Sequence, residues 1–149
     1  MFGLALRAPA CLSLLVACFG VATGALADPC KAIPDKGALP AYLRPGAGFT
    51  GPVVYIGDGD SLCVALGPRP DQWVEVRLAD FYAPELHTPT GPAAKSALDR
   101  LTAGQRLACV AQHRSYDRIV AVCRINDVSL GDLLRQAGVA EGGRRRSTP

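Results

Sequence analysis

The sequence of 149 residues contains no internal repeat, no Cys-x-x-Cys pair and, beyond residue 27, no apolar run long enough to cross a bilayer. Without a repeat, solenoid and propeller architectures are excluded. Without a closely spaced cysteine pair, the common zinc-site patterns are missing. The first 27 residues also lack Asp and Glu, so all 13 acidic residues follow them. The formal net charge of +3 is mildly basic and excludes little by itself.

The N-terminal segment has the three parts of a secretory signal peptide. Arg7 supplies a positive start, and residues 11–19 form a short apolar run. Ala25-Leu26-Ala27 then provides a small-residue cleavage site before Asp28. We therefore predict that residues 1–27 are removed and that the mature protein is periplasmic or secreted. The mature protein is expected to be a monomer without a membrane segment. The alternative is that the N-terminal segment is retained as an anchor.

Cleavage would leave an even number of cysteines, which in an exported chain indicates two disulfides. The sequence alone allows three pairings, and a metal site is the rival interpretation. A hairpin centred on Tyr116 would place two of the cysteines opposite each other and leave the other two to pair. The predicted bridges are Cys109–Cys123 and Cys30–Cys63.

Composition divides the mature chain into three parts. Proline and glycine are frequent over residues 28–50, which predicts an extended arm with few regular elements. Residues 51–141 form the expected domain, and residues 142–149 a disordered basic tail. Basic residues also cluster over 100–124, where Asp117 is the only acid, and this makes a polyanionic partner plausible.

Hydrophobic patterns predict five short strands in the domain. A helix is expected over residues 92–102, and a final helix begins with a capping pattern at Ser129 and ends at Gly138. This order favours an α+β fold that is mainly β, a five-stranded OB-type barrel with one inserted and one C-terminal helix. The predicted strands cover residues 53–56, 61–66, 73–81, 106–112 and 118–125.

The turn Asp58-Gly59-Asp60-Ser61 is the first candidate for chemistry. An Asp-Gly pair is most often a structural hairpin turn. A second carboxylate at Asp60 and a hydroxyl at Ser61 raise the alternative of a calcium site, because hard cations bind oxygen ligands of this kind.

Arg77, Glu85 and Arg118 are the second candidate set. Two guanidinium groups can hold a phosphate as charge develops on it, and a carboxylate can activate water. Taken singly, an arginine in a strand, a glutamate in a loop and an arginine beside a hairpin turn need no functional explanation. We expect the strands to bring all three toward one mouth of the barrel.

Residues 53–141 resemble the staphylococcal nuclease (thermonuclease) family. The family shows an Asp-Gly-Asp-Thr turn, then Arg-Leu-x-x-x-Asp-x-Pro-Glu, and then Asp-x-Tyr-Gly-Arg. The spacing from arginine to glutamate and the intervening helix also match. The corresponding residues of this chain are Asp58-Gly59-Asp60-Ser61, Arg77-Leu78, Ala83-Pro84-Glu85 and Tyr116-Asp117-Arg118.

The resemblance implies roles for these residues. Arg77 and Arg118 would clamp the phosphate, and Glu85 would act as the general base on the attacking water. Tyr116 would contact the substrate beside the phosphate. Members of the family are calcium-dependent phosphodiesterases that act on DNA and RNA, so calcium and nucleic acid are the implied cofactor and partner.

The metal site implied by the resemblance is altered in this chain. Asp60 would be a calcium ligand, with Asp58 in a supporting role. The family's second metal-binding Asp corresponds to Tyr82, whose phenol has a pKa near 10 and is neutral at pH 7. We hypothesise that Asp80, two residues earlier on the same expected strand face, substitutes as the ligand. The alternative is that Tyr82 packs or hydrogen-bonds and that the metal site is degenerate.

Two further residues lie close to the expected catalytic positions. Asp117 replaces a glycine and could pair with Arg118, which would partly neutralise the clamp. His87 follows Glu85 by two positions and is expected to be a solvated loop residue; the alternative is that it contacts substrate or tunes the glutamate.

The sequence therefore predicts an exported metal-dependent nuclease that hydrolyses DNA or RNA. The first alternative is a catalytically degenerate OB-type module that binds nucleic acid or an envelope partner. A structural envelope protein, with the Pro-rich arm of residues 28–50 as its contact segment, is the third interpretation.

Overall fold

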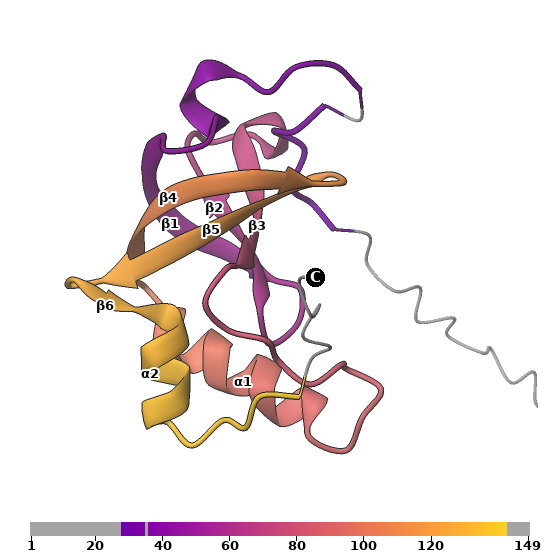
Figure 1. Cartoon of the computed structure of the whole chain (residues 1–149), viewed down its shortest axis with the longest axis vertical. Coiled ribbons are helices and arrows are strands. Elements are labelled where there is room, and N and C mark those ends of the chain that lie inside the picture. The colour runs from indigo at the N-terminus through magenta and orange to yellow at the C-terminus, as the bar shows by residue number, and fades with distance from the viewer. Residues whose placement is uncertain (1–27, 35, 143–149) are drawn as a thin grey trace, which may run out of the picture.

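The computed structural model describes residues 28–34 and 36–142 (Figure 1). The predicted signal peptide and all but the first residue of the predicted disordered tail lie outside these residues. No helix within the described ranges is long and apolar enough to span a bilayer.

The described strands form one sheet that closes into a five-stranded mixed barrel. Their order is β3-β2-β1-β4-β5-β6, and a parallel pairing between β3 and β5 closes the barrel. The prediction of an α+β OB-like barrel with a C-terminal helix is confirmed. The strands are β1 (Gly48–Ile56), β2 (Ser61–Ala65), β3 (Trp73–Leu78), β4 (Arg106–Ser115), β5 (Arg118–Ile125) and the short β6 (Val128–Ser129).

Alternation along the strands separates the barrel core from its outer face. In β3, Val74, Val76 and Leu78 are buried, whereas the residues between them are half-buried. In β5, Ile119 and Ala121 are buried in the same way. Side chains of a strand point alternately to opposite faces, so every second residue of β3 and β5 lies on the outer face of the barrel.

The helices lie together at one end of the barrel (Figure 1). Helix α1 (Gly91–Thr102) begins one residue before the predicted helix and buries Ala94 and Leu98. A Cβ added at position 59 would lie 2.7 Å from the Ala94 Cβ, so the turn before β2 packs closely on this helix. Glycine is therefore required at position 59.

Helix α2 (Leu130–Gln136) follows the predicted cap. The Ser129 hydroxyl oxygen accepts a hydrogen bond from the Asp132 backbone N–H at 3.1 Å. Such a bond satisfies one of the free N–H groups of the first helical turn. Gly138, with a φ of +77°, reverses the chain after the helix, as the sequence predicted.

The N-terminal arm has more structure than its composition predicted. Strand β1 begins at Gly48, five residues before the predicted start, and Phe49 pairs with Cys109 of β4. The arm also contains the short 3-10 helix η1 (Ala41–Leu43), and a second, η2 (Pro70–Gln72), precedes β3. The glycine and proline residues at the start of β1 have low strand propensity, so the sequence pattern did not predict this part of the strand. Pairing with the partner strand stabilises it instead.

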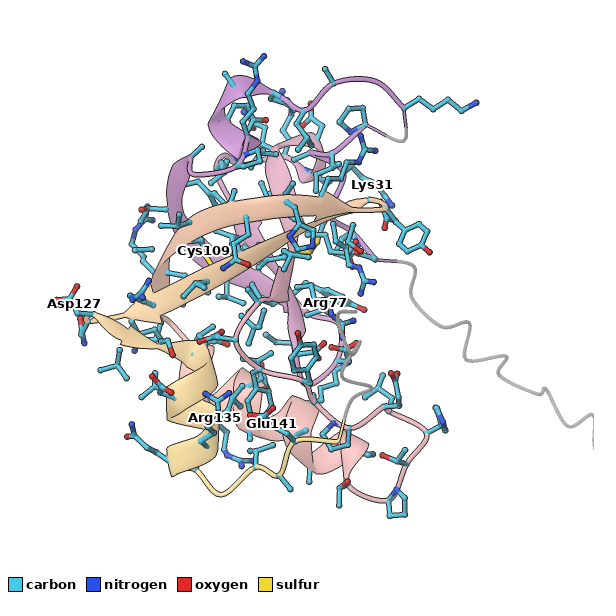
Figure 2. The ribbon with its side chains drawn as sticks, viewed as in Figure 1. Lys31, Arg77, Cys109, Asp127, Arg135 and Glu141 are labelled. Carbon is cyan, nitrogen blue, oxygen red and sulfur yellow. A yellow bond between two sulfur atoms is a disulfide. The ribbon has the colours of Figure 1, made fainter. Side chains whose placement is uncertain are left out.

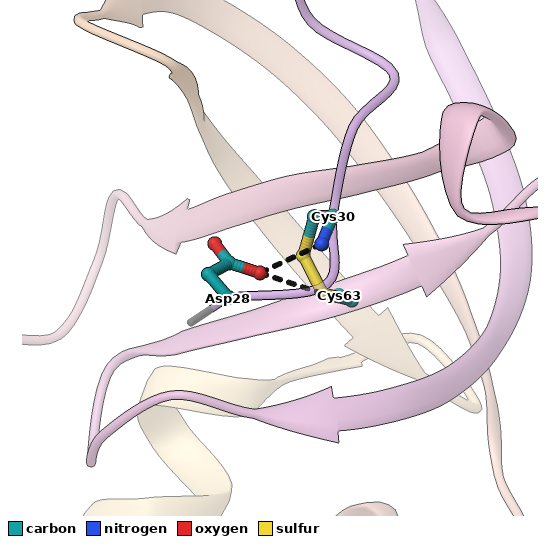
Figure 3. Close-up of a disulfide and its surroundings, with 3 residues drawn as sticks. All are labelled: Asp28, Cys30 and Cys63. Atoms are coloured by element: carbon teal, nitrogen blue, oxygen red, sulfur yellow. Dashed lines mark hydrogen bonds between the residues drawn. A yellow bond between two sulfur atoms is a disulfide. The ribbon is translucent and has the colours of Figure 1, made fainter. Parts of the chain in front are cut away.

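Both predicted disulfides are confirmed. The Cα–Cα distance is 5.8 Å for Cys30–Cys63 and 4.0 Å for Cys109–Cys123, and the latter pair lies directly opposite in the β4–β5 ladder. The first bridge fixes the N-terminal segment on the outer face of β2, where the Asp28 Oδ1 accepts the Cys30 N–H at 2.8 Å (Figure 3). This cover explains why all residues of β2 are buried. Two bridges indicate an oxidising, extracytoplasmic environment.

Candidate functional site

A pocket of about 290 Å³ lies on the outer face of the barrel, where β3, β5 and the end of β4 meet. Its position follows from strand alternation, because Arg77 lies between the buried Val76 and Leu78. The parallel ladder pairs Arg77 with Val120, and the antiparallel ladder pairs Arg118 with Ser115. The lining residues are Arg77, Leu78, Ala79, Tyr82, His113, Ser115, Tyr116, Arg118 and Val120.

The structure thus brings together four of the residues singled out from the sequence, Arg77, Tyr82, Tyr116 and Arg118. Tyr116 occupies the hairpin between β4 and β5, where its φ is +60° and its side chain is 80% exposed. A non-glycine residue with such a φ is uncommon and costs conformational energy. The turn holds a large, exposed aromatic ring at the edge of the pocket.

Two further lining residues, His113 and Ser115, were missed from the sequence because the predicted strand ended at residue 112. A bulge in β4 lies between Ala111 and His113, so that His113 pairs with Val120. Val120 lies on the outer face, and the extra residue of the bulge turns His113 toward the pocket. The predicted symmetry of the hairpin about Tyr116 is the feature that could have extended the strand to these positions.

Arg77 joins the pocket to the acidic turn. Its Nη2 lies 3.4 Å from the Asp60 Oδ2, and the Asp60 side chain is only 4% exposed (the position of Arg77 is labelled in Figure 2). The same oxygen accepts the Ala83 backbone N–H at 2.9 Å. Burial, together with the charge of Asp58, raises the pKa of Asp60 to about 6, although Arg77 and the Ala83 N–H oppose this rise.

Asp58 has a structural role in this turn. Its Oδ1 accepts the Asp60 backbone N–H at 2.9 Å and the Ser61 hydroxyl at 2.8 Å. Burial alone would raise the pKa of Asp58, but these hydrogen bonds outweigh it and hold the pKa below its ordinary value. The carboxylate is therefore ionised and already engaged within the turn.

Asp80 lies against helix α2. Strand β3 ends at Leu78, three residues before the predicted end, so strand alternation does not extend to Asp80. A Cβ on Gly131 would come within 2.7 Å of the Asp80 Oδ2. The Asp80 Oδ1 is buried and has no hydrogen-bond partner among the described residues.

The carboxylates expected to bind calcium do not form a cluster of three. Among the described residues, Asp58, Asp60 and Asp80 do not form a group of three converging ligands. The group that does converge is Asp28, Cys30 and Cys63, and its two sulfurs are joined in a disulfide. Calcium binding stays a prediction.

Glu85 is exposed in the loop between β3 and α1 and is not among the residues that line the pocket. Its carbonyl accepts hydrogen bonds from the Thr88 N–H at 2.9 Å and the Thr88 hydroxyl at 2.7 Å. His87 in the same loop is exposed, as expected. No ion pair joins Arg118 to Asp117 in the described part of the chain.

An acidic group lies beside this site on the outer face. Glu75 of β3 is two residues before Arg77, and its carboxyl is half-buried against that of Asp28. Burial, the hydrogen bond with Asp28 and the charges of Asp28 and Asp117 raise the pKa of Glu75 to about 8, while Arg118 opposes the rise. Near neutral pH, the hydrogen-bonded Glu75 and Asp28 pair therefore retains a proton in the folded protein.

Glu75 is expected to make stability depend on pH. Its pKa is 4.5 ordinarily and about 8 in the folded protein, so the folded state binds the additional proton between these values. Stability must then fall as pH rises from about 4.5 to about 8. Glu75→Gln should flatten this part of the profile and stabilise the protein by about 1–3 kcal/mol at pH 8. Urea unfolding at several pH values measures the effect, and an unchanged slope in the variant would contradict it.

A scan of the sequence against protein-family models and a search of curated proteins gave no match.

Proposed function

We propose that the pocket binds a phosphodiester group of DNA or RNA and that this exported protein hydrolyses it. The observation that carries the proposal is the convergence of Arg77 from β3 and Arg118 from β5 on one pocket. The other polar lining side chains are two phenols, an imidazole and a hydroxyl, and no carboxylate is among them. Such a lining favours an anion and supplies hydrogen-bond donors to its oxygens.

The aromatic residues favour a nucleotide over a simple phosphate ester. Tyr116 is exposed at the edge of the pocket, and Tyr82 is half-buried in its wall. Bases stack on such rings with little sequence preference, and each contact contributes about 1–3 kcal/mol. Single-stranded nucleic acid is the preferred form, because its bases are free to stack.

In the proposed hydrolysis, water attacks phosphorus in line with the leaving oxygen. Glu85 accepts a proton from the water as the new P–O bond forms and the bond to the leaving oxygen breaks. Arg77 and Arg118 stabilise the charge on the remaining phosphate oxygens. His113 lines the pocket and is able to donate a proton to the leaving oxygen. Substrate binding has to draw the exposed Glu85 loop toward the phosphate.

The second candidate function is nucleic-acid binding without hydrolysis. Two observations favour it. Glu85 does not line the pocket, and Tyr82 lines it at the position where the family has a metal-binding carboxylate. Binding requires only the arginines and tyrosines, whereas turnover also requires the glutamate.

Glu85→Gln separates the two functions. If the protein is a hydrolase, the variant should bind single-stranded DNA as tightly as the unsubstituted protein but cleave it about 100- to 10,000-fold more slowly, because a general base is lost. Binding is measured by fluorescence anisotropy and cleavage by gel electrophoresis of end-labelled DNA and RNA. Binding without cleavage by the unsubstituted protein would assign the second function.

Chelator and calcium serve as controls in the same experiment. Binding should be unchanged by chelator, because Arg77 and Arg118 supply the positive charge of the pocket. A titration of cleavage with calcium then tests the expectation drawn from the family resemblance. Absence of binding and of cleavage under all conditions would overturn the proposal.

A further inference from the structure

Arg114 of β4 lies outside the phosphate pocket, although both of its neighbours line it. His113 and Ser115 belong to the pocket lining, whereas Arg114 does not. In the β4–β5 ladder Arg114 pairs with the fully buried Ile119, so it lies on the opposite side of the hairpin from the pocket. Arg114 is therefore not one of the arginines proposed to bind phosphate.

The Arg114 guanidinium is instead bound to backbone carbonyl oxygens from two separate segments. Its Nε donates to the Tyr116 carbonyl at 2.6 Å. Its Nη1 donates to the Gly37 carbonyl at 3.1 Å, and its Nη2 donates to the Pro34 carbonyl. The planar guanidinium suits this arrangement, because its N–H groups point in fixed directions and each reaches a different acceptor. A single side chain thus joins the turn of the hairpin to the N-terminal arm.

The arm is fixed to the barrel on both sides of the carbonyls that Arg114 binds. Upstream, the Cys30–Cys63 bridge and the buried Ile33 hold the chain on the barrel. Downstream, the fully buried Leu43 of η1 packs in the core. In Figure 1 the tip of the β4–β5 hairpin lies beside this N-terminal segment. Arg114 therefore connects the hairpin turn to an anchored segment.

We propose that Arg114 is a positioning residue for Tyr116 and that it makes the tyrosine ring a preformed platform for one base of a bound strand. This inference deepens the proposed function and rests on the binding of nucleic acid by the pocket. Tyr116 needs such support, because its φ of +60° costs conformational energy and the residue is mostly exposed. A turn that is held before the ligand arrives lowers the ordering cost of binding. Loss of Arg114 should therefore weaken the stacking of bases and leave the contacts to phosphate unchanged.

The test compares two ligands that carry the same phosphates, measured by fluorescence anisotropy. One is an oligothymidylate of about ten nucleotides, a typical site size for an OB-type fold, and the other is a strand of equal length built from abasic sites. Arg114→Lys keeps the positive charge but cannot donate to three separated carbonyls at once. We expect it to weaken binding of the oligothymidylate by about 3- to 10-fold, which is part of the roughly 5- to 150-fold that one stacked base contributes. Affinity for the abasic strand should be unchanged, and equal weakening with the two ligands would overturn the proposal.

The matched control is Arg106→Lys, which replaces an exposed arginine of the same strand that does not line the pocket. It should change neither affinity. If it weakens oligothymidylate binding as much as Arg114→Lys does, the effect is not specific to the Tyr116 turn and the proposal fails. If the unsubstituted protein binds neither ligand, the proposed function itself fails.

A double-mutant cycle assigns the effect to the tyrosine ring. Tyr116→Ala should weaken binding of the oligothymidylate, and the addition of Arg114→Lys to this variant should cause no further loss, because the two residues act as one unit. A further loss as large as that of Arg114→Lys alone would show that the arginine acts by another route. An unchanged affinity of Tyr116→Ala would likewise overturn the proposal.

Backbone NMR measures the positioning without any ligand. In Arg114→Lys the nitrogen-15 order parameters of Tyr116 and Asp117 should fall from about 0.85, the value of rigid backbone, toward the roughly 0.6 of flexible segments. Order parameters in the core strands should stay the same, which shows that the barrel remains folded. Unchanged values at Tyr116 and Asp117 would mean that the turn holds its conformation without Arg114, contrary to the proposal.

Discussion

Arg77→Ala is expected to lower kcat/KM for cleavage of single-stranded DNA by about 1000-fold or more. The guanidinium lines the pocket and lies 3.4 Å from the Asp60 carboxylate. Loss of one preorganised donor to a developing oxyanion typically costs a factor of about 100–1000. The substitution also leaves a carboxylate of 4% exposure without its cation, so that the pocket loses positive charge and gains an unpaired acid.

The effect of the unpaired Asp60 carboxylate has to be separated from the loss of the phosphate-binding guanidinium. Asp60 retains the Ala83 N–H as its partner, but its pKa, already raised to about 6, should rise further without Arg77. The double variant Arg77→Ala/Asp60→Asn removes the unpaired charge. We expect it to regain about 1–3 kcal/mol of stability relative to Arg77→Ala, measured by urea unfolding, and no cleavage activity. Recovery of activity in the double variant would show that Arg77 acts only as the partner of Asp60.

Removal of the Cys30–Cys63 disulfide, with both cysteines replaced by alanine, is expected to destabilise the protein by about 4 kcal/mol. The bridge joins residues 33 apart in sequence, whereas Cys109–Cys123 joins residues 14 apart. Because the entropy of loop closure grows with loop length, the corresponding value for Cys109–Cys123 is about 3 kcal/mol. Both bridges contain buried sulfur, so cavity effects add to each value.

The two bridges also differ in what they hold. Cys109 and Cys123 lie on neighbouring strands that remain paired without the bridge. Cys30 instead fixes a segment whose other backbone contacts include the Lys31 N–H to the Pro70 carbonyl at 2.9 Å and the Ala32 N–H to the Trp73 carbonyl at 3.0 Å. Urea unfolding of the two double variants, with a dithiol-reduced control, measures the difference. A larger loss from the Cys109–Cys123 variant would contradict the expected order.

Those parts of the fold that depend on local pattern were predicted well from the sequence. Strands β3 and β5 alternate between buried and half-buried residues, and helix α1 presents its small apolar residues to the core at helical spacing. The cap at Ser129 is a local hydrogen bond and was predicted correctly. The Cys109–Cys123 pairing followed from the symmetry of one hairpin.

The parts that depend on non-local pairing were not predicted. The start of β1 at Gly48 is held by β4, and the bulge that turns His113 into the pocket depends on the register of β5. The hypothesis for Asp80 required β3 to continue beyond Leu78, whereas the chain bends there. In the same way, we expected Glu85 to converge with Arg77 and Arg118, but Glu85 is not among the residues that line the pocket.

The parallel β3–β5 pairing has a consequence for the order of folding. Val76–Leu78 and Ile119–Ala121 belong to two hairpins that each form from nearby residues, whereas their mutual pairing closes a long loop. Contacts of high sequence separation carry the largest entropic cost and form late. Arg77 and Arg118 line one pocket only when this seam is closed, so the proposed polyanion site exists in the closed barrel alone. If the pocket binds nucleic acid as proposed, the bound ligand should therefore oppose the opening of the seam.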